Sequence, residues 1–151
     1  GAHGVLGKIL KVIPEMVFSG ATQIPYSIPI GGLVDLSYLS HDPRTKDDYI
    51  NDDLDSLKLE SKLIFELMKC AQSTFSRPIR SRCPSYAMVG SADRVVGAQD
   101  VIEYFTTVDK SFNFKVFDGA YHEIHNEIEK YRKPYFDHLK TIFSEVLFKE
   151  D

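Results

Sequence analysis

Two side chains in the second half of the sequence could together activate a nucleophile. They are the carboxylate of Asp93, within residues 90–96, and the imidazole of His122, within residues 119–127. A carboxylate that accepts a hydrogen bond from a histidine Nδ1 fixes the ring tautomer and stabilises the imidazolium that forms when Nε2 takes a proton. Asp93 and His122 are therefore candidates for the acid and the general base of a catalytic site.

Two short apolar segments are predicted to be the strands that position this pair. The run over 85–90 ends on a glycine, as buried parallel strands often do, and apolar residues alternate with polar ones over 112–116. In open α/β sheets, functional groups collect just beyond the carboxyl ends of strands. Asp93 follows the first strand and His122 the second, so we expect the two side chains on adjacent loops.

Helices are predicted beside both strands. Apolar residues at helical spacing predict one helix over 98–108, between the strands, and a final one over 127–148. The final helix is expected to bury one stripe against the sheet, made of Tyr135, Phe136, Leu139, Ile142, Phe143, Val146 and Leu147. The order strand, helix, strand, helix predicts an α/β fold with parallel strands and a right-handed crossover.

The first half of the chain has a different pattern. Helical spacing predicts an amphipathic helix over 5–18, kinked at Pro14, and a longer helix over 63–75. Residues 20–55 contain prolines and glycines and then a charged stretch over 41–55 without a sustained period, which predicts a loop with short turns. The stretch over 41–55 could form a mobile lid.

The loops that carry the two candidate residues resemble those of a known family. GSADRVV at 90–96 is similar to the acid-bearing loop of monoglyceride lipases and related lysophospholipases, and GAYH at 119–122, followed by Glu127, resembles their histidine loop. Residues 26–53 are similar to the cap region of that family. The resemblance implies an α/β-hydrolase in which Asp93 and His122 belong to a Ser-Asp-His triad, in the chain order of that fold.

The sequence departs from this family because no G-x-S-x-G nucleophile elbow occurs in it. The resemblance therefore implies the C-terminal half of an α/β-hydrolase: a cap region over 1–82, then the last two parallel strands with flanking helices over 83–151, with the N-terminal half of the sheet absent. The parent protein would hydrolyse monoacylglycerol or lysophospholipid-like lipids, or another acyl substrate such as a peptide or a simple ester. The chain alone should be inactive, and no cofactor or metal is expected.

Partners follow from the same interpretation. The first strand would expose an edge that pairs with the missing N-terminal half, or with a second copy of the chain if the protein is a non-catalytic interaction module. The helix over 5–18 could line an acyl tunnel or contact a membrane surface, although intramolecular packing is the commoner meaning of such a stripe.

Composition excludes other classes of protein. The net charge of -4 and the scattered Lys and Arg residues argue against binding to nucleic acid. No apolar run approaches the ~20 residues that span a bilayer. Cys70 and Cys83 have no metal-ligand spacing, and such sparse cysteine usage favours a reducing compartment. We expect a cytoplasmic protein, with peripheral membrane contact through the cap as a second option.

The candidate residues also have structural interpretations. Asp93 could cap the helix that follows it. His122, His125 and Glu127 could suggest a metal site, yet the HExxH spacing is absent, and we expect His125 and Glu127 to support the loop or cap a helix. Ser91 could be a nucleophile, but it lies on the same loop as the acid, not on a strand-to-helix elbow.

Overall fold

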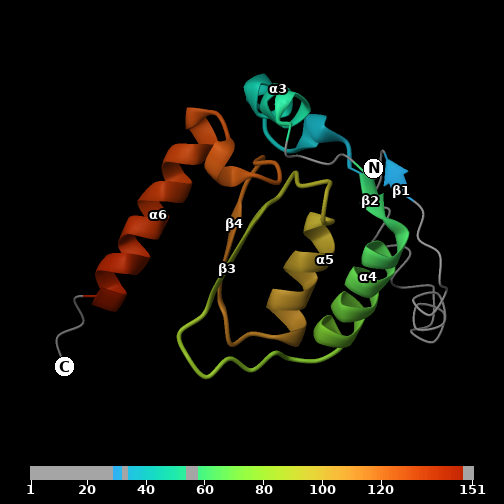
Figure 1. The fold of residues 1–151 in the computed structure, drawn as a ribbon. Coiled ribbons are helices and arrows are strands. Elements are labelled where there is room, and N and C mark those ends of the chain that lie inside the picture. Colours follow the sequence, from blue (N-terminus) through green and yellow to red (C-terminus); the bar gives the residue numbers. More distant parts are fainter. Residues whose placement is uncertain (1–28, 32–33, 54–57, 148–151) are drawn as a thin grey trace.

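The central unit of the protein is a strand, helix, strand arrangement in the second half of the chain. The computed structural model describes residues 29–31, 34–53 and 58–147 (Figure 1). Strands β3 (Tyr86–Gly90) and β4 (Asn113–Phe117) are parallel, with Tyr86 opposite Asn113 and Gly90 opposite Phe117. The two predicted strands are thereby confirmed to within a residue.

Helices lie on both sides of this pair of strands. Helix α5 (Ala98–Glu103) continues as a π-helical turn, Tyr104–Val108, and these two elements occupy the predicted helix over 98–108. The final helix, α6 (Glu129–Leu147), runs along the opposite face of the strands from α5 (Figure 1). The observed architecture is the predicted α/β class.

The upstream part of the structure contains a longer helix and a short antiparallel pair. Helix α4 (Ser61–Phe75) confirms the helix predicted over 63–75, and it follows strand β2 (Lys58–Glu60), which pairs with β1 (Pro29–Gly31). The helix predicted over 5–18 lies outside the described residues. So does the part of the predicted loop over 20–28.

The prediction of a loop throughout 20–55 was wrong at helix α3 (Pro43–Asn51). Asp42 caps this helix by accepting a hydrogen bond from the Arg44 N–H, and Pro43 occupies its first turn. The hydrogen bonds from Arg44 lower the pKa of Asp42 to about 2, so the cap is ionised at neutral pH. The one buried residue of α3 is Thr45, which is polar. The helix therefore has no buried apolar stripe that the sequence could reveal.

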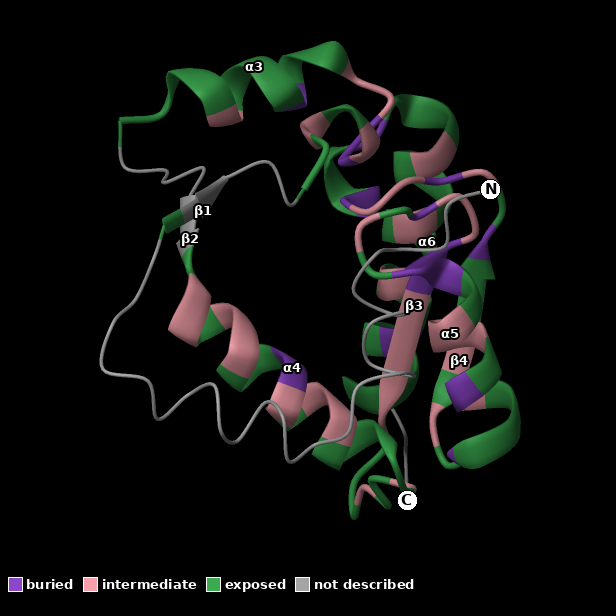
Figure 2. Cartoon of the chain, turned by 90° about the vertical axis from the view of Figure 1, so that its right-hand side faces the viewer, coloured by how far each residue is buried: buried purple, intermediate pink, exposed green. Residues whose placement is uncertain are grey.

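The core is concentrated at the carboxyl ends of the two strands. Phe117, Ala120 and Ile124 form a buried cluster, against which Met88 and two tyrosines of α6 pack. Figure 2 shows this buried zone at the end of β3 nearest the loops that follow the strands. Burial of these apolar side chains therefore stabilises the region in which Asp93 and His122 lie.

The apolar stripe expected on the last helix is only partly covered. Ile142 is buried, whereas Phe136, Phe143, Val146 and Leu147 are exposed, with 69% of Leu147 accessible. Among the described residues, β3 pairs with β4 alone, so its other edge has no partner strand there. Within the same residues, no helix combines the length and apolar character that crossing a bilayer requires.

Candidate active site

The loop after β3 fixes the carboxylate of Asp93 in a buried turn. Its side chain is 3% exposed. Its Oδ1 accepts hydrogen bonds from the backbone N–H groups of Val95 at 2.8 Å and Val96 at 3.2 Å. The N-cap position of α5 is Gly97, in the left-handed conformation, and not Asp93. Asp93 therefore caps the turn that precedes α5, not the helix itself, and only its Oδ1 takes part in this capping.

The second oxygen of Asp93 contacts the imidazole of His122. Asp93 Oδ2 lies 2.8 Å from His122 Nδ1. An ionised carboxylate only accepts hydrogen bonds, so Nδ1 carries the proton and the neutral ring presents Nε2 as an acceptor. The side chain of His122 is 33% exposed, and within the described part of the chain no group forms a hydrogen bond with its Nε2.

The environment of His122 favours its charged form. The hydrogen bond to Asp93 raises the pKa of His122, burial opposes this, and the negative charges of Asp93 and Glu123 add to the increase. A carboxylate that raises the pKa of a histidine in this way stabilises the imidazolium produced when Nε2 accepts a proton. The pair therefore has the geometry and the electrostatics of a general base with its orienting acid.

The two loops approach each other closely because residue 90 is glycine. A Cβ on Gly90 would lie 2.3 Å from the carbonyl oxygen of Ala120 and 2.4 Å from that of Tyr121, closer than real Cβ contacts. Pairing continues beyond the strands, since the Ser91 N–H donates to Phe117 O at 2.9 Å and the Ala92 N–H to Ala120 O at 3.1 Å. This backbone contact sets the separation of Asp93 and His122.

The hydroxyl of Ser91 joins the two loops instead of facing the histidine. It donates to Asp118 Oδ1 at 2.9 Å and accepts from the Gly119 N–H at 2.7 Å. Neither of these hydrogen bonds involves His122. The geometry therefore favours a structural role for Ser91 over that of a nucleophile.

A segment from the first half of the chain docks on the histidine loop. We call residues 36–51, which include α3, the docking segment. Backbone N–H groups of the loop donate to it, from Glu123 to Leu39 O at 2.8 Å and from His122 to Tyr38 O at 3.4 Å. The Tyr49 hydroxyl donates to Glu123 Oε1 at 2.6 Å. The stretch over 41–55 that was interpreted as a lid thus contains Tyr49, which is anchored beside the site.

Sequence reasoning missed how the docking segment contacts both loops. The guanidinium of Arg94, next to Asp93, donates to the Tyr38 hydroxyl at 2.6 Å and lies over the Tyr38 ring at 4.2 Å from its centroid. The burial of Glu123, which is 9% exposed, could not be predicted from the sequence either. No local pattern links these residues, because their partners lie far apart along the chain.

The residues weighed as a metal site, His122, His125 and Glu127, have different surroundings. Glu127 is fully buried and hydrogen-bonds to His41, whereas His125 is exposed. Across residues 29–31, 34–53 and 58–147, no group of three or more His, Cys, Asp or Glu side chains could hold a metal ion. Glu127 instead supports the loop, as the sequence suggested.

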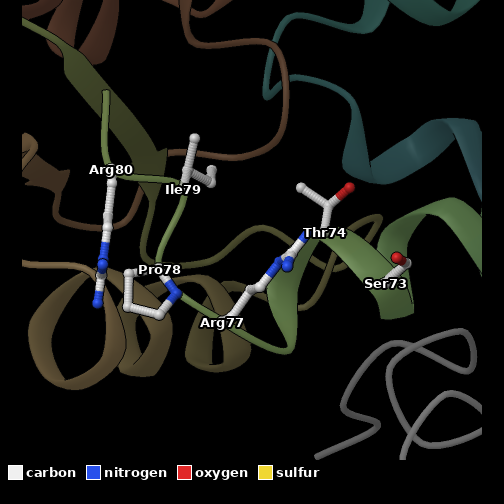
Figure 3. Close-up of a pocket in the computed structure, with 6 residues that line it drawn as sticks. All are labelled: Ser73, Thr74, Arg77, Pro78, Ile79 and Arg80. Carbon is white, nitrogen blue, oxygen red and sulfur yellow. The ribbon is translucent and has the colours of Figure 1, made fainter. Parts of the chain in front are cut away.

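A shallow depression occurs elsewhere, at the end of α4 (Figure 3). It is lined by Ser73, Thr74, Arg77, Pro78, Ile79 and Arg80. The buried carboxylate of Asp109 holds this loop by accepting hydrogen bonds from the Ile79 and Arg80 N–H groups. Because these residues lead toward the amino end of β3, the depression is separate from the pair at the carboxyl ends.

A parallel strand, helix, strand unit that carries acid and histidine loops at its carboxyl end is the arrangement expected of an α/β-hydrolase. The chain belongs to the family described as serine aminopeptidase, S33, whose sequence profile matches residues 4–129. The family resemblance inferred from the two loops is thereby confirmed. No curated protein matches the sequence.

Solved structures of lipases share the fold. The monoacylglycerol lipase of Paleococcus ferrophilus superimposes with a TM-score of 0.67 at 22% identity, covering 86% of this chain and 51% of the lipase. A soluble variant of monoglyceride lipase from Saccharomyces cerevisiae, in complex with a substrate analogue, gives 0.63 at 14% identity, covering 89% of this chain and 50% of the lipase. The chain thus spans about half the length of these structures.

Proposed function

We propose that this chain supplies the acid, Asp93, and the general base, His122, of a serine ester hydrolase. The nucleophilic serine would come from polypeptide beyond this sequence, which contains no G-x-S-x-G elbow and spans about half the length of the similar lipases. The observation that carries the proposal is the 2.8 Å contact between His122 Nδ1 and Asp93 Oδ2, with no hydrogen-bond partner at Nε2 among the described residues.

The proposed reaction is acyl transfer in two stages. His122 Nε2 takes the proton from the serine hydroxyl as its oxygen attacks the ester carbonyl carbon, and Asp93 stabilises the imidazolium. His122 then returns that proton to the departing alcohol, which leaves an acyl-enzyme. In the second stage His122 takes a proton from water, the resulting hydroxide attacks the acyl carbon, and the serine regains its proton as the carboxylic acid departs.

Monoacylglycerol or a lysophospholipid-like ester is the proposed substrate class. The support is the resemblance of both loops to monoglyceride lipases, together with the two lipase structures that share the fold. The family is described by a peptidase activity, so a peptide or simple ester is the competing substrate. Rates on a monoacylglycerol, a lysophospholipid, a short ester and an aminoacyl amide would rank these options.

The deciding experiment uses the longer polypeptide that carries this chain. We expect a fluorophosphonate to label a serine outside residues 1–151 and the protein to release fatty acid from a monoacylglycerol. His122→Gln should abolish labelling, whereas Ser91→Ala should retain it, because the hydrogen bonds of the Ser91 hydroxyl within the described residues go to the neighbouring loop. Normal labelling of the His122→Gln protein, or labelling of Ser91, would contradict the proposal.

A non-catalytic interaction module is the second candidate. It is favoured by the exposed apolar stripe of α6 and by the edge of β3 that has no partner strand in the described residues. Phe143, 59% exposed, lies within that stripe. This candidate predicts that the 151-residue chain self-associates, that Phe143→Lys makes it monomeric, and that no longer polypeptide containing it turns over an ester. Sedimentation velocity with the turnover assay separates the two candidates.

A further inference from the structure

We propose that Glu127 is a positioning residue for His122, and that it fixes the histidine loop jointly with His41 of the docking segment. The inference rests on the proposed function only in calling His122 the general base. The orientation of the His122 ring, which Glu127 is proposed to fix, can be measured without turnover.

Glu127 is a buried carboxylate with a complete set of partners. Its side chain is 0% exposed. Oε1 accepts from the Tyr121 N–H at 2.8 Å and lies 2.7 Å from His41 Nδ1. Oε2 accepts from the His41 N–H at 3.0 Å and from the Ile128 N–H at 3.1 Å. Each oxygen thus has two donors, as an ionised carboxylate requires when water is excluded.

The hydrogen bonds keep this buried group charged. Burial by itself would raise the pKa of Glu127, but the hydrogen bonds from Tyr121, from the His41 side chain and backbone, and from Ile128 together lower it below its ordinary value. A neutral amide in its place has one acceptor oxygen and would direct its NH₂ group at two donors. The site is therefore specific for a carboxylate.

These contacts act on the backbone immediately before His122. Glu127 holds the Tyr121 N–H, and the carbonyl of Tyr121 lies against Gly90 of the acid loop. The His41 ring stacks on the Tyr121 ring, with centroids 3.7 Å apart and planes 21° apart. The peptide that carries the imidazole is thus fixed on one side by Glu127 and on the other by the acid loop.

The docking segment completes the restraint on the far side of His122. The N–H of Glu123 donates to Leu39 O at 2.8 Å, and Ser40 Oγ donates to Asn126 O at 2.9 Å. His41 follows directly and closes the contact to Glu127. Because the loop is held before and after His122, the ring can meet Asp93 without a large loss of backbone entropy.

The test measures the tautomer of neutral His122 by long-range proton–nitrogen NMR on the 151-residue chain at high pH. The native chain should show the Nδ1–H form, because Asp93 accepts that proton. Glu127→Gln should convert it to a mixture with the Nε2–H form that unrestrained histidine prefers. Asp109→Asn is the matched control: Asp109 is also a buried carboxylate, 2% exposed, and it anchors the other end of the sheet.

The outcomes separate positioning from general stability. If Glu127→Gln and Asp109→Asn lower the urea midpoint alike but only the first changes the tautomer, Glu127 positions His122. If neither changes the tautomer, Glu127 is merely structural and the inference fails. Neither result depends on esterase activity, so failure of the proposed function would be seen separately, as a longer polypeptide without turnover.

A second variant keeps the inference testable if Glu127→Gln does not fold. His41→Phe retains a ring to stack on Tyr121 and leaves the charge of Glu127 in place, but it removes the contact at Nδ1. We expect a smaller change of the His122 tautomer in the same direction. An unchanged tautomer in a folded His41→Phe chain would overturn the role assigned to the docking segment.

Discussion

The histidine loop contributes one member to each of two carboxylate–imidazole pairs, His122 to the pair with Asp93 and Glu127 to the pair with His41, and the two pairs are almost the same in local geometry. His122 Nδ1 lies 2.8 Å from Asp93, and His41 Nδ1 lies 2.7 Å from Glu127. The carboxylates are 3% and 0% exposed and the imidazoles 33% and 29%. Neither distance nor burial therefore distinguishes the pair suited to catalysis from the pair suited to structure.

The surroundings of each pair make the distinction. The spare oxygen of Asp93 is held by its own turn, and His122 keeps Nε2 without a partner in the part of the chain described. Both oxygens of Glu127 take two donors each, and the His41 ring is stacked on Tyr121. Among the described residues His41 Nε2 has no hydrogen-bond partner either, so the pairs differ in their carboxylates. Glu127 has four donors from other parts of the loop and the docking segment, whereas Asp93 has two from its own turn and one from His122.

The largest expected effect is the loss of the Asp93 carboxylate. Asp93→Asn leaves an amide that can donate to the ring and favour the wrong tautomer, so the proposed ester hydrolysis by a longer polypeptide should fall by about 10,000-fold. Steady-state kcat on a monoacylglycerol measures this. His41→Phe, which alters the other pair, should reduce kcat far less. Equal losses from the two substitutions would contradict the contrast drawn between the pairs.

A smaller effect is expected from forcing the acid and histidine loops apart. Gly90→Ala places a Cβ 2.3 Å from backbone at Ala120, which cannot rotate away, so the free energy of unfolding should fall by roughly 3 kcal/mol. Gly119→Ala is the control. The atoms nearest to its Cβ belong to the Tyr131 side chain, the first at 3.0 Å, so its cost comes mainly from the left-handed φ of +78° and should be about 1 kcal/mol. Urea unfolding of both variants tests this order.

Ser91→Ala should have a modest effect on stability and little on catalysis. It removes two hydrogen bonds between the loops, to Asp118 and from Gly119, which predicts a loss of about 1 to 2 kcal/mol. The kcat of the longer polypeptide should stay within about tenfold of the native value, since Ser91 is not placed as the nucleophile. Complete loss of activity in a stable Ser91→Ala protein would count against the assignment of Asp93 and His122 alone.

The smallest expected effects are on the pH dependence of the free energy of unfolding, and the two pairs affect it in opposite directions. The pKa of His122 is raised above 6.5 in the fold, so its pair stabilises the protein below that pH and the contribution is lost as pH rises through the raised value. The pKa of Glu127 is lowered below 4.5, so its contribution is present above that pH and lost as pH falls through the lowered value.

Urea midpoints measured as a function of pH would separate these two contributions. Asp93→Asn should flatten the curve only on the neutral to alkaline side, and Glu127→Gln only on the acidic side. A single variant that flattens both sides would show that the two pairs titrate as one unit.

The sequence could predict the first pair and not the second. Asp93 and His122 each directly follow a strand whose apolar pattern is local, so the fold rule for strand ends brings them together. His41 and Glu127 are 86 residues apart, and no pattern in either neighbourhood refers to the other. Helix α3 was missed for a related reason, because its stability depends on the Asp42 cap and on docking through Thr45 and Tyr49, not on an apolar stripe.

The uncovered stripe of α6 has a practical consequence for handling this polypeptide. The exposed side chains of this stripe are apolar: Phe136, Phe143, Val146 and Leu147. Such surfaces bind chaperones and promote aggregation during synthesis. Recombinant yield of the isolated chain should therefore depend on growth temperature and chaperone supply more strongly than that of a longer polypeptide able to cover α6.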